Sequence, residues 1–139
     1  MSAACYLDSS AILACLYGEP GALPPGSLAP AVTSILSRVE CLRSIERHRW
    51  LGRLTDERML RKREGLFQIL RAARVVAMDP AILDRASGSF SVPLKTLDAI
   101  HLATALRVAE ELGGTLTFAT HDRPLAAAAR AYGLKVVGA

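Results

Sequence analysis

The chain has 139 residues and a net charge of +4, with 51% apolar and 22% charged residues. This composition excludes an intrinsically disordered chain, and no apolar run reaches the roughly 18 residues that a membrane-spanning helix needs. We therefore expect one soluble domain over residues 1–139. Since residues 1–8 lack the basic region and the long apolar segment of a signal peptide, we also expect a cytoplasmic location without membrane association.

The cysteines and the basic residues say little about chemistry by themselves. Cys5, Cys15 and Cys41 are odd in number and lack metal-ligand spacing, so we expect small buried side chains rather than disulfides or zinc ligands. Arginine and lysine are concentrated in residues 38–74. A solvated helix face and a surface for nucleic acid or an acidic protein explain this concentration equally well.

The first third of the chain predicts a strand, a turn and a helix. Residues 3–7 form an apolar run that ends at Asp8, and residues 11–17 have helical length and composition. Parallel sheets bind ligands at the carboxyl ends of their strands, so Asp8 is a candidate functional residue. Capping of the helix is the alternative, but Ser9 and Ser10 are equally suited to that role.

A loop, a strand and a long helix follow. Residues 18–30 are rich in proline and glycine, which predicts a loop. Residues 31–33 predict a brief strand, and Ser34 is a suitable N-cap for a helix to about Trp50. The apolar face of this helix is predicted to contain Ile35, Leu36, Val39, Leu42 and Ile45.

Glu40 lies at the edge of this apolar face, where a carboxylate without a partner is costly. A pair with Arg43 or Ser44 on the same helix would explain it structurally. A metal ion explains it better, and we adopt that interpretation.

The middle of the chain predicts two more helices around a strand. Thr55 is expected to cap a helix to about Arg71, residues 72–78 are expected to form a buried strand, and Asp79 begins a short helix through Ala86. The predicted apolar positions of the longer helix are Met59, Leu60, Leu66, Phe67, Ile69 and Leu70.

The next helix carries a further carboxylate. Thr96 is expected to be its N-cap, which places Asp98 in the first turn, where the helix dipole favours an anion. That helix is expected to end at Gly113. His101, one turn beyond Asp98, is interpreted as an ordinary helix position rather than as a ligand or general base.

The last third repeats the strand-to-helix pattern. Residues 115–119 predict a strand, Asp122 lies in the turn that follows, residues 125–132 predict a helix, and residues 135–137 a final strand. This alternation predicts an α/β fold, with a parallel sheet that has helices on both faces.

Asp8, Glu40, Asp98 and Asp122 can then meet at one edge of that sheet. Like charges 4 Å apart repel by about 4 kcal/mol at an effective dielectric constant of 20, so such a cluster needs a cation. Oxygen ligands without a histidine and cysteine cluster favour Mg²⁺ or Mn²⁺. Hydrolysis of a phosphodiester by a metal-activated water is the reaction such a site suits.

Four segments also resemble a known family, the PIN domains, and among them the VapC-type ribonuclease toxins of toxin–antitoxin systems. The segments are Tyr6–Ala11, Thr33–Glu40, Thr96–Ala105 and Thr117–Leu125. They occur in the family's order and cover the chain from end to end.

This resemblance implies a three-layer α/β/α fold with a short, mostly parallel central sheet. It also implies cleavage of RNA with Mg²⁺ or Mn²⁺, a small antitoxin partner of the VapB type, and a homodimer. By position, the family's metal-binding acids are Asp8, Glu40 and Asp98, the fourth and more variable acid is Asp122, and the supporting polar residues are Ser10 and Thr120.

One departure and two alternatives remain. Residues 18–30 shorten or replace a helix that relatives commonly place there, which puts the docking of an antitoxin or a second subunit in doubt. A silent PIN-like module that binds RNA or protein is one alternative. The other is a phosphatase with Asp8 as nucleophile, which expects an acid where Ser10 stands.

Overall fold

The computed structural model describes residues 4–139, so residue 3 of the first predicted strand lies outside the described part. The elements, in chain order, are β1 Ala4–Leu7, α1 Ser9–Tyr17, the short 3₁₀ helix η1 Pro25–Leu28, β2 Ala31–Ser34, α2 Ile35–Trp50, α3 Asp56–Ala72, β3 Arg74–Val76, α4 Pro80–Ala86, α5 Thr96–Glu111, β4 Leu116–Ala119, α6 Arg123–Ala131 and β5 Lys135–Val137. None of the described helices combines the length and the apolar character that crossing a bilayer requires.

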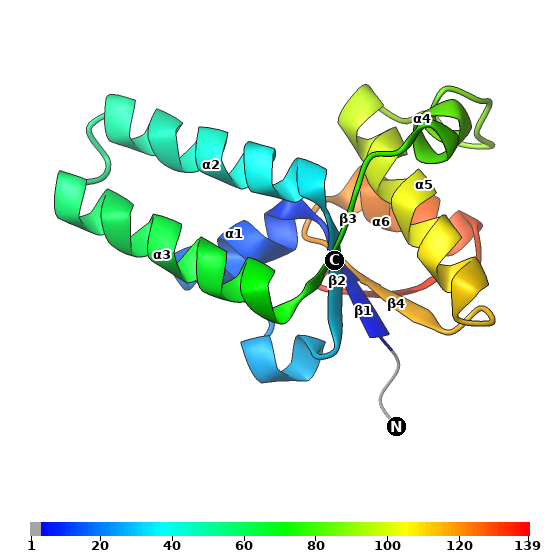
Figure 1. The fold of residues 1–139 in the computed structure, drawn as a ribbon, viewed down its shortest axis with the longest axis horizontal. Coiled ribbons are helices and arrows are strands. Elements are labelled where there is room, and N and C mark those ends of the chain that lie inside the picture. The colour runs from blue at the N-terminus through cyan, green and yellow to red at the C-terminus, as the bar shows by residue number, and fades with distance from the viewer. Residues whose placement is uncertain (1–3) are drawn as a thin grey trace.

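The strands form one parallel sheet in the order β3-β2-β1-β4-β5 (Figure 1). β1 is central and pairs with β2 on one side and β4 on the other, so that Tyr6 lies beside Val32 and Phe118. Because every described pair is parallel, the carboxyl ends of β1, β2 and β4 lie along the same edge. The α/β prediction is confirmed.

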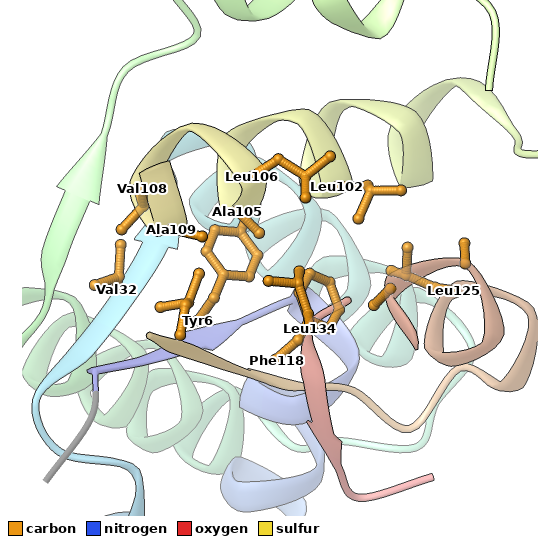
Figure 2. Close-up of a cluster of buried hydrophobic side chains, with 13 residues drawn as sticks. Tyr6, Val32, Leu102, Ala105, Leu106, Val108, Ala109, Phe118, Leu125 and Leu134 are labelled. Carbon is orange, nitrogen blue, oxygen red and sulfur yellow. The ribbon is translucent and has the colours of Figure 1, made fainter. Parts of the chain in front are cut away.

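Helices cover both faces of the sheet and give a three-layer α/β/α fold. On one face Tyr6 and Phe118 pack with Leu102 of α5 and Leu125 of α6, as Figure 2 shows. The other face packs against α1, α2 and α3. Alternate residues of β1 divide between the two cores, since Tyr6 points to the first and Leu7 to the second.

α2 and α3 form a long hairpin that projects away from the sheet, with α1 beside it (Figure 1). Ser34 caps α2 as predicted, because its hydroxyl accepts a hydrogen bond from the Leu36 N–H at 3.0 Å. The loop predicted over residues 18–30 is confirmed: within that range η1 is the regular element, and no α-helix occurs there.

Some predicted apolar positions are wrong. Val39 of α2 is 52% exposed and Leu60 of α3 is 61% exposed. Leu36 and Ile45 of α2 are buried as predicted, and Ser37 and Cys41 are buried with them. The Ser37 hydroxyl accepts a hydrogen bond from β2, whereas Cys41 packs against α1. Ser37 and Cys41 have small side chains, and a pattern based on large apolar residues does not detect their burial.

Two further expectations need correction. The strand predicted over residues 72–78 is shorter, and it is an edge strand in which Arg74 and Val75 are exposed rather than buried. Thr96 is the first residue of α5 and not its N-cap; Lys95 holds that position without a side-chain hydrogen bond. Asp98 still lies in the first turn.

Candidate active site

Asp8 follows β1 directly and is 3% exposed. Its Oδ1 accepts hydrogen bonds from the Ala11 N–H at 2.9 Å and from the Ser10 hydroxyl at 2.7 Å, and its Oδ2 accepts one from the Thr120 hydroxyl at 2.5 Å. Burial raises the pKa of Asp8 above the usual range, while these hydrogen bonds act to lower it. Asp8 therefore both caps α1 and stands as a fixed carboxylate at the sheet edge.

Ser10 and Thr120 join the two strand-to-helix corners. The Ser10 hydroxyl accepts a hydrogen bond from the His121 N–H at 2.9 Å and lies 3.2 Å from the Thr120 hydroxyl. Asp122 donates its backbone N–H to the Thr120 hydroxyl at 3.0 Å and caps α6 through its own side chain. Both polar residues thus position the corners that carry Asp8 and Asp122.

Asp98 faces these corners from the first turn of α5. It is half-buried, and together with Asp122 it lines a cavity of about 340 Å³. The pKa of Asp98 is raised, first by burial and then by the negative charges of Asp122, Asp8 and Glu40, while His101 acts in the opposite direction. The carboxylate of Asp98 therefore lies in the electrostatic field of the other three.

Glu40 has a partner that the sequence did not suggest. Its Oε1 accepts a hydrogen bond of 2.6 Å from Nε2 of His101, and not from Arg43 or Ser44. Nδ1 of His101 lies 2.7 Å from the hydroxyl of Tyr6, which is completely buried. Since a carboxylate can only accept, Nε2 carries a hydrogen, and in the neutral imidazole Nδ1 then accepts from the Tyr6 hydroxyl.

Tyr6 and His101 are thus residues whose role the sequence analysis missed. Burial raises the pKa of Tyr6 well above its usual range, so the phenol keeps its proton and remains a donor. A tyrosine inside an otherwise apolar central strand is a usable signal, because a buried tyrosine hydroxyl needs a partner. His101 of α5 is also buried, with 2% of its surface exposed.

These residues fit a hard divalent cation. All four acids supply oxygen ligands, and the pKa of Asp98 is raised first by burial and then by the charges of the other acids. In residues 4–139, no three Asp, Glu, His or Cys side chains form a ready-made ligand set. One oxygen of Glu40 is engaged by His101, which leaves Oε2 as the oxygen available for a cation.

Three known proteins place this geometry in context. The chain is 35% identical to ribonuclease VapC46 of Mycobacterium tuberculosis over 139 residues, covering 97% of both proteins. PAE2754 from Pyrobaculum aerophilum has a similar structure, with a TM-score of 0.66 and 22% identity, covering 99% of this chain and 92% of that one. A toxin–antitoxin complex from Klebsiella pneumoniae contains a similar chain, with a TM-score of 0.59 and 16% identity, over 86% of this chain and 87% of that one.

The family model for the PIN domain matches residues 5–131. This range contains all four acids and the Tyr6 and His101 pair beside them. The chain therefore belongs to the PIN domain family.

Proposed function

We propose that this protein is a metal-dependent endoribonuclease, the toxin of a VapBC-like pair, which hydrolyses RNA phosphodiester bonds with Mg²⁺ or Mn²⁺. The observation that carries the proposal is the gathering of acids at one edge of the sheet: Thr120 links Asp8 to the backbone of Asp122, and Asp122 lines the same cavity as Asp98. Carboxylates gathered at this edge repel an RNA phosphate unless a cation joins them. The relative named as a ribonuclease, 35% identical over nearly the whole chain, supports the same activity.

Each acid has a distinct part in this proposal. Asp8 is held by three hydrogen bonds, so its carboxylate is oriented before any cation binds. Glu40 offers its second oxygen, while Asp98 and Asp122 face the cavity between α5 and α6. A bound divalent ion supplies a water of lowered pKa and neutralises charge on the phosphoryl group.

Cleavage of RNA in the presence of Mn²⁺ tests the assignment, with Asp98→Asn as the variant. We expect activity to fall by about 100-fold or more, because the substitution removes a charged ligand and leaves the shape of the side chain. Asp84→Asn is the matched control, since Asp84 is exposed on α4 and outside the site. Equal activity of Asp98→Asn and the native protein contradicts the proposal.

The same experiment separates the alternative of a silent binding module. If the native protein binds RNA but neither cleaves it nor binds Mn²⁺ in a titration, the chain has kept the fold and lost the chemistry. Because the RNA backbone is held by charge in either case, its binding is expected to weaken as salt rises.

We propose two protein partners, a small antitoxin and a second copy of this chain. The toxin–antitoxin complex from Klebsiella pneumoniae, which contains a chain of similar fold, supports the first. Co-purification with the product of a short neighbouring reading frame tests for the antitoxin, and light scattering of the purified chain tests for a homodimer. A chain that stays monomeric contradicts the homodimer, and a neighbouring product that does not bind the chain contradicts the antitoxin.

A further inference from the structure

A cleft of about 620 Å³ lies at the far end of the α2 and α3 hairpin, outside the acidic site. It is lined by Tyr17 of α1, His48 of α2, Arg53 and Leu54 of the connecting loop, and Arg58, Arg61 and Lys62 of α3. No aspartate or glutamate belongs to this lining in the described part of the chain. We call this feature the basic cleft.

The positive charge of the basic cleft is largely unbalanced. The side chains of Arg53 and Arg58 make no ion pair or hydrogen bond with any described residue. Arg61 has one contact of 3.7 Å to Glu57, an exposed pair on the same helix that stabilises weakly. Cations that face one cleft without a counter-charge repel each other, which favours an anionic ligand.

Three side chains give the cleft two aromatic rings and a fixed cation. The rings of Tyr17 and His48 lie edge to face, with their centroids 5.0 Å apart. Lys62 donates a hydrogen bond of 2.6 Å to the Leu16 carbonyl, and its Nζ lies 4.9 Å from the centre of the Tyr17 ring. Arginines beside aromatic rings suit phosphates together with bases.

The cleft is joined to the acidic site by two helices. α1 begins beside Asp8 and ends at Tyr17, and on α2 the step from Glu40 to His48 corresponds to about 12 Å of helix. Figure 1 shows both helices running away from the sheet in the same direction. A strand of RNA whose scissile phosphate lies at the acids can therefore reach the cleft within a few nucleotides.

The two ends of this path differ in charge. The acidic site repels a polyanion, so the binding energy for RNA must come from elsewhere on the surface. An acidic protein segment is the competing ligand, but protein interfaces depend on buried apolar anchors, and Leu54 is the aliphatic side chain of the lining. RNA suits the combination of arginine, lysine and aromatic rings better.

We infer that the basic cleft binds the RNA backbone a few nucleotides away from the cleaved bond and supplies much of the affinity for substrate. This inference rests on the proposed function, because it places the same substrate on a second surface. Each RNA phosphate that the protein neutralises releases counterions, and this changes the slope of log K for binding against log salt by about 0.7 for a single strand. Removing two contacts makes that slope shallower by about 1.4.

The test measures binding of a fluorescent single-stranded RNA to Asp98→Asn protein over a series of salt concentrations. In that background we expect Arg53→Gln combined with Arg58→Gln to weaken binding on the order of tenfold near 0.1 M salt and to reduce the slope. The matched control is Arg71→Gln combined with Lys135→Gln, which removes the same charge from exposed residues outside the cleft. Circular dichroism checks that both double variants are folded.

The outcomes distinguish RNA binding at the basic cleft from a general effect of positive charge, and they test the inference separately from the proposed function. A loss confined to the cleft variant supports the inference, whereas an equal loss in both double variants, or none in either, overturns it. A cleft variant that loses binding to polyglutamate but keeps RNA binding also overturns it, in favour of an acidic protein. If the native protein cleaves RNA and Arg53→Gln combined with Arg58→Gln, made with Asp98 intact, leaves the KM for RNA unchanged, the inference fails and the proposed function stands.

Discussion

At the scale of single residues, the orientation of Glu40 depends on two buried side chains from other elements, Tyr6 and His101. Tyr6 donates to Nδ1 of His101, and Nε2 of His101 donates to Oε1 of Glu40. Both supporting residues are buried, so the hydrogen bond between them is shielded from solvent, while the Glu40 end of the chain is partly exposed. The chain of hydrogen bonds fixes which oxygen of Glu40 is left for a cation.

Tyr6→Phe tests this role, because it removes the hydroxyl and keeps the ring that packs on Phe118. Without that donor, Nδ1 of His101 loses its partner and Glu40 is held less firmly. We expect the affinity for Mn²⁺, measured by calorimetry, to fall roughly tenfold, the scale found when a residue that supports a metal ligand is removed. His101→Leu is expected to have at least the same effect, whereas His101→Gln keeps an N–H donor for Glu40 and restores part of the affinity.

Two measurements distinguish positioning from general damage to the core. Tyr132→Phe is the matched control, since it also removes a hydrogen-bonded phenol hydroxyl but lies at the end of α6, beside Ser91. Long-range ¹⁵N NMR of the metal-free protein is expected to show the His101 hydrogen on Nε2. Native Mn²⁺ affinity in both Tyr6→Phe and His101→Leu contradicts the positioning role.

At the scale of elements, the sequence predicted those features that local rules determine. Asp8 and Asp122 were placed correctly between a strand and a helix, because an apolar run followed by a capping residue is a local signal. The partner of Glu40 was missed because His101 lies on a different helix, and no spacing rule connects α2 to α5. The exposure of Val39 has the same origin, since the depth to which α2 is buried depends on α3.

The end of β5 also shapes the site from a distance along the chain. Gly138 has a φ of +95°, and a Cβ placed there would lie 2.6 Å from the carbonyl oxygen of Thr120. Thr120 in turn donates to Asp8. The lack of a side chain at Gly138 thus lets the β4 corner hold its place beside β1.

Gly138→Ala is therefore expected to destabilise the fold by roughly 2–4 kcal/mol, through left-handed backbone strain and displacement of Thr120. Gly133→Ala is the matched control, because its φ is +84° and nothing lies within 4 Å of the added methyl group. It should cost only the backbone strain of about 1 kcal/mol. Urea unfolding measures both free energies, and equal losses would show that the contact with Thr120 has no effect.

At the scale of the whole molecule, the acidic site opposes the stability of the metal-free fold. The pKa values of Asp8 and Asp98 are raised in the folded protein, so the folded state holds their protons more tightly than the unfolded chain does. Their contribution to stability is greatest below the usual carboxyl pKa and is lost as the pH rises through the raised values. Asp79 and Glu110 act in the opposite direction, because the Ile82 N–H and then Arg107 lower the pKa of Asp79, and Arg85 lowers that of Glu110.

Comparing the native protein with Asp98→Asn isolates the contribution of the acidic site, since the other titrations are common to both. Without metal at neutral pH, we expect Asp98→Asn to melt a few degrees higher, because it removes a charge that the other acids repel. The difference should shrink as the pH falls through the raised pKa of Asp98, where the native side chain becomes neutral as well. Calorimetric melting curves at several pH values measure this.

Saturating Mn²⁺ should reverse the order of the two proteins. An ion present at 100 times its dissociation constant stabilises the folded state by about 2.7 kcal/mol. Asp98→Asn should lack most of this stabilisation, because it has lost a carboxylate that binds the ion. Asp84→Asn, with its substitution outside the site, should follow the native curve with and without metal. If the native protein still melts below Asp98→Asn after Mn²⁺ is added, the four acids do not act together on a cation.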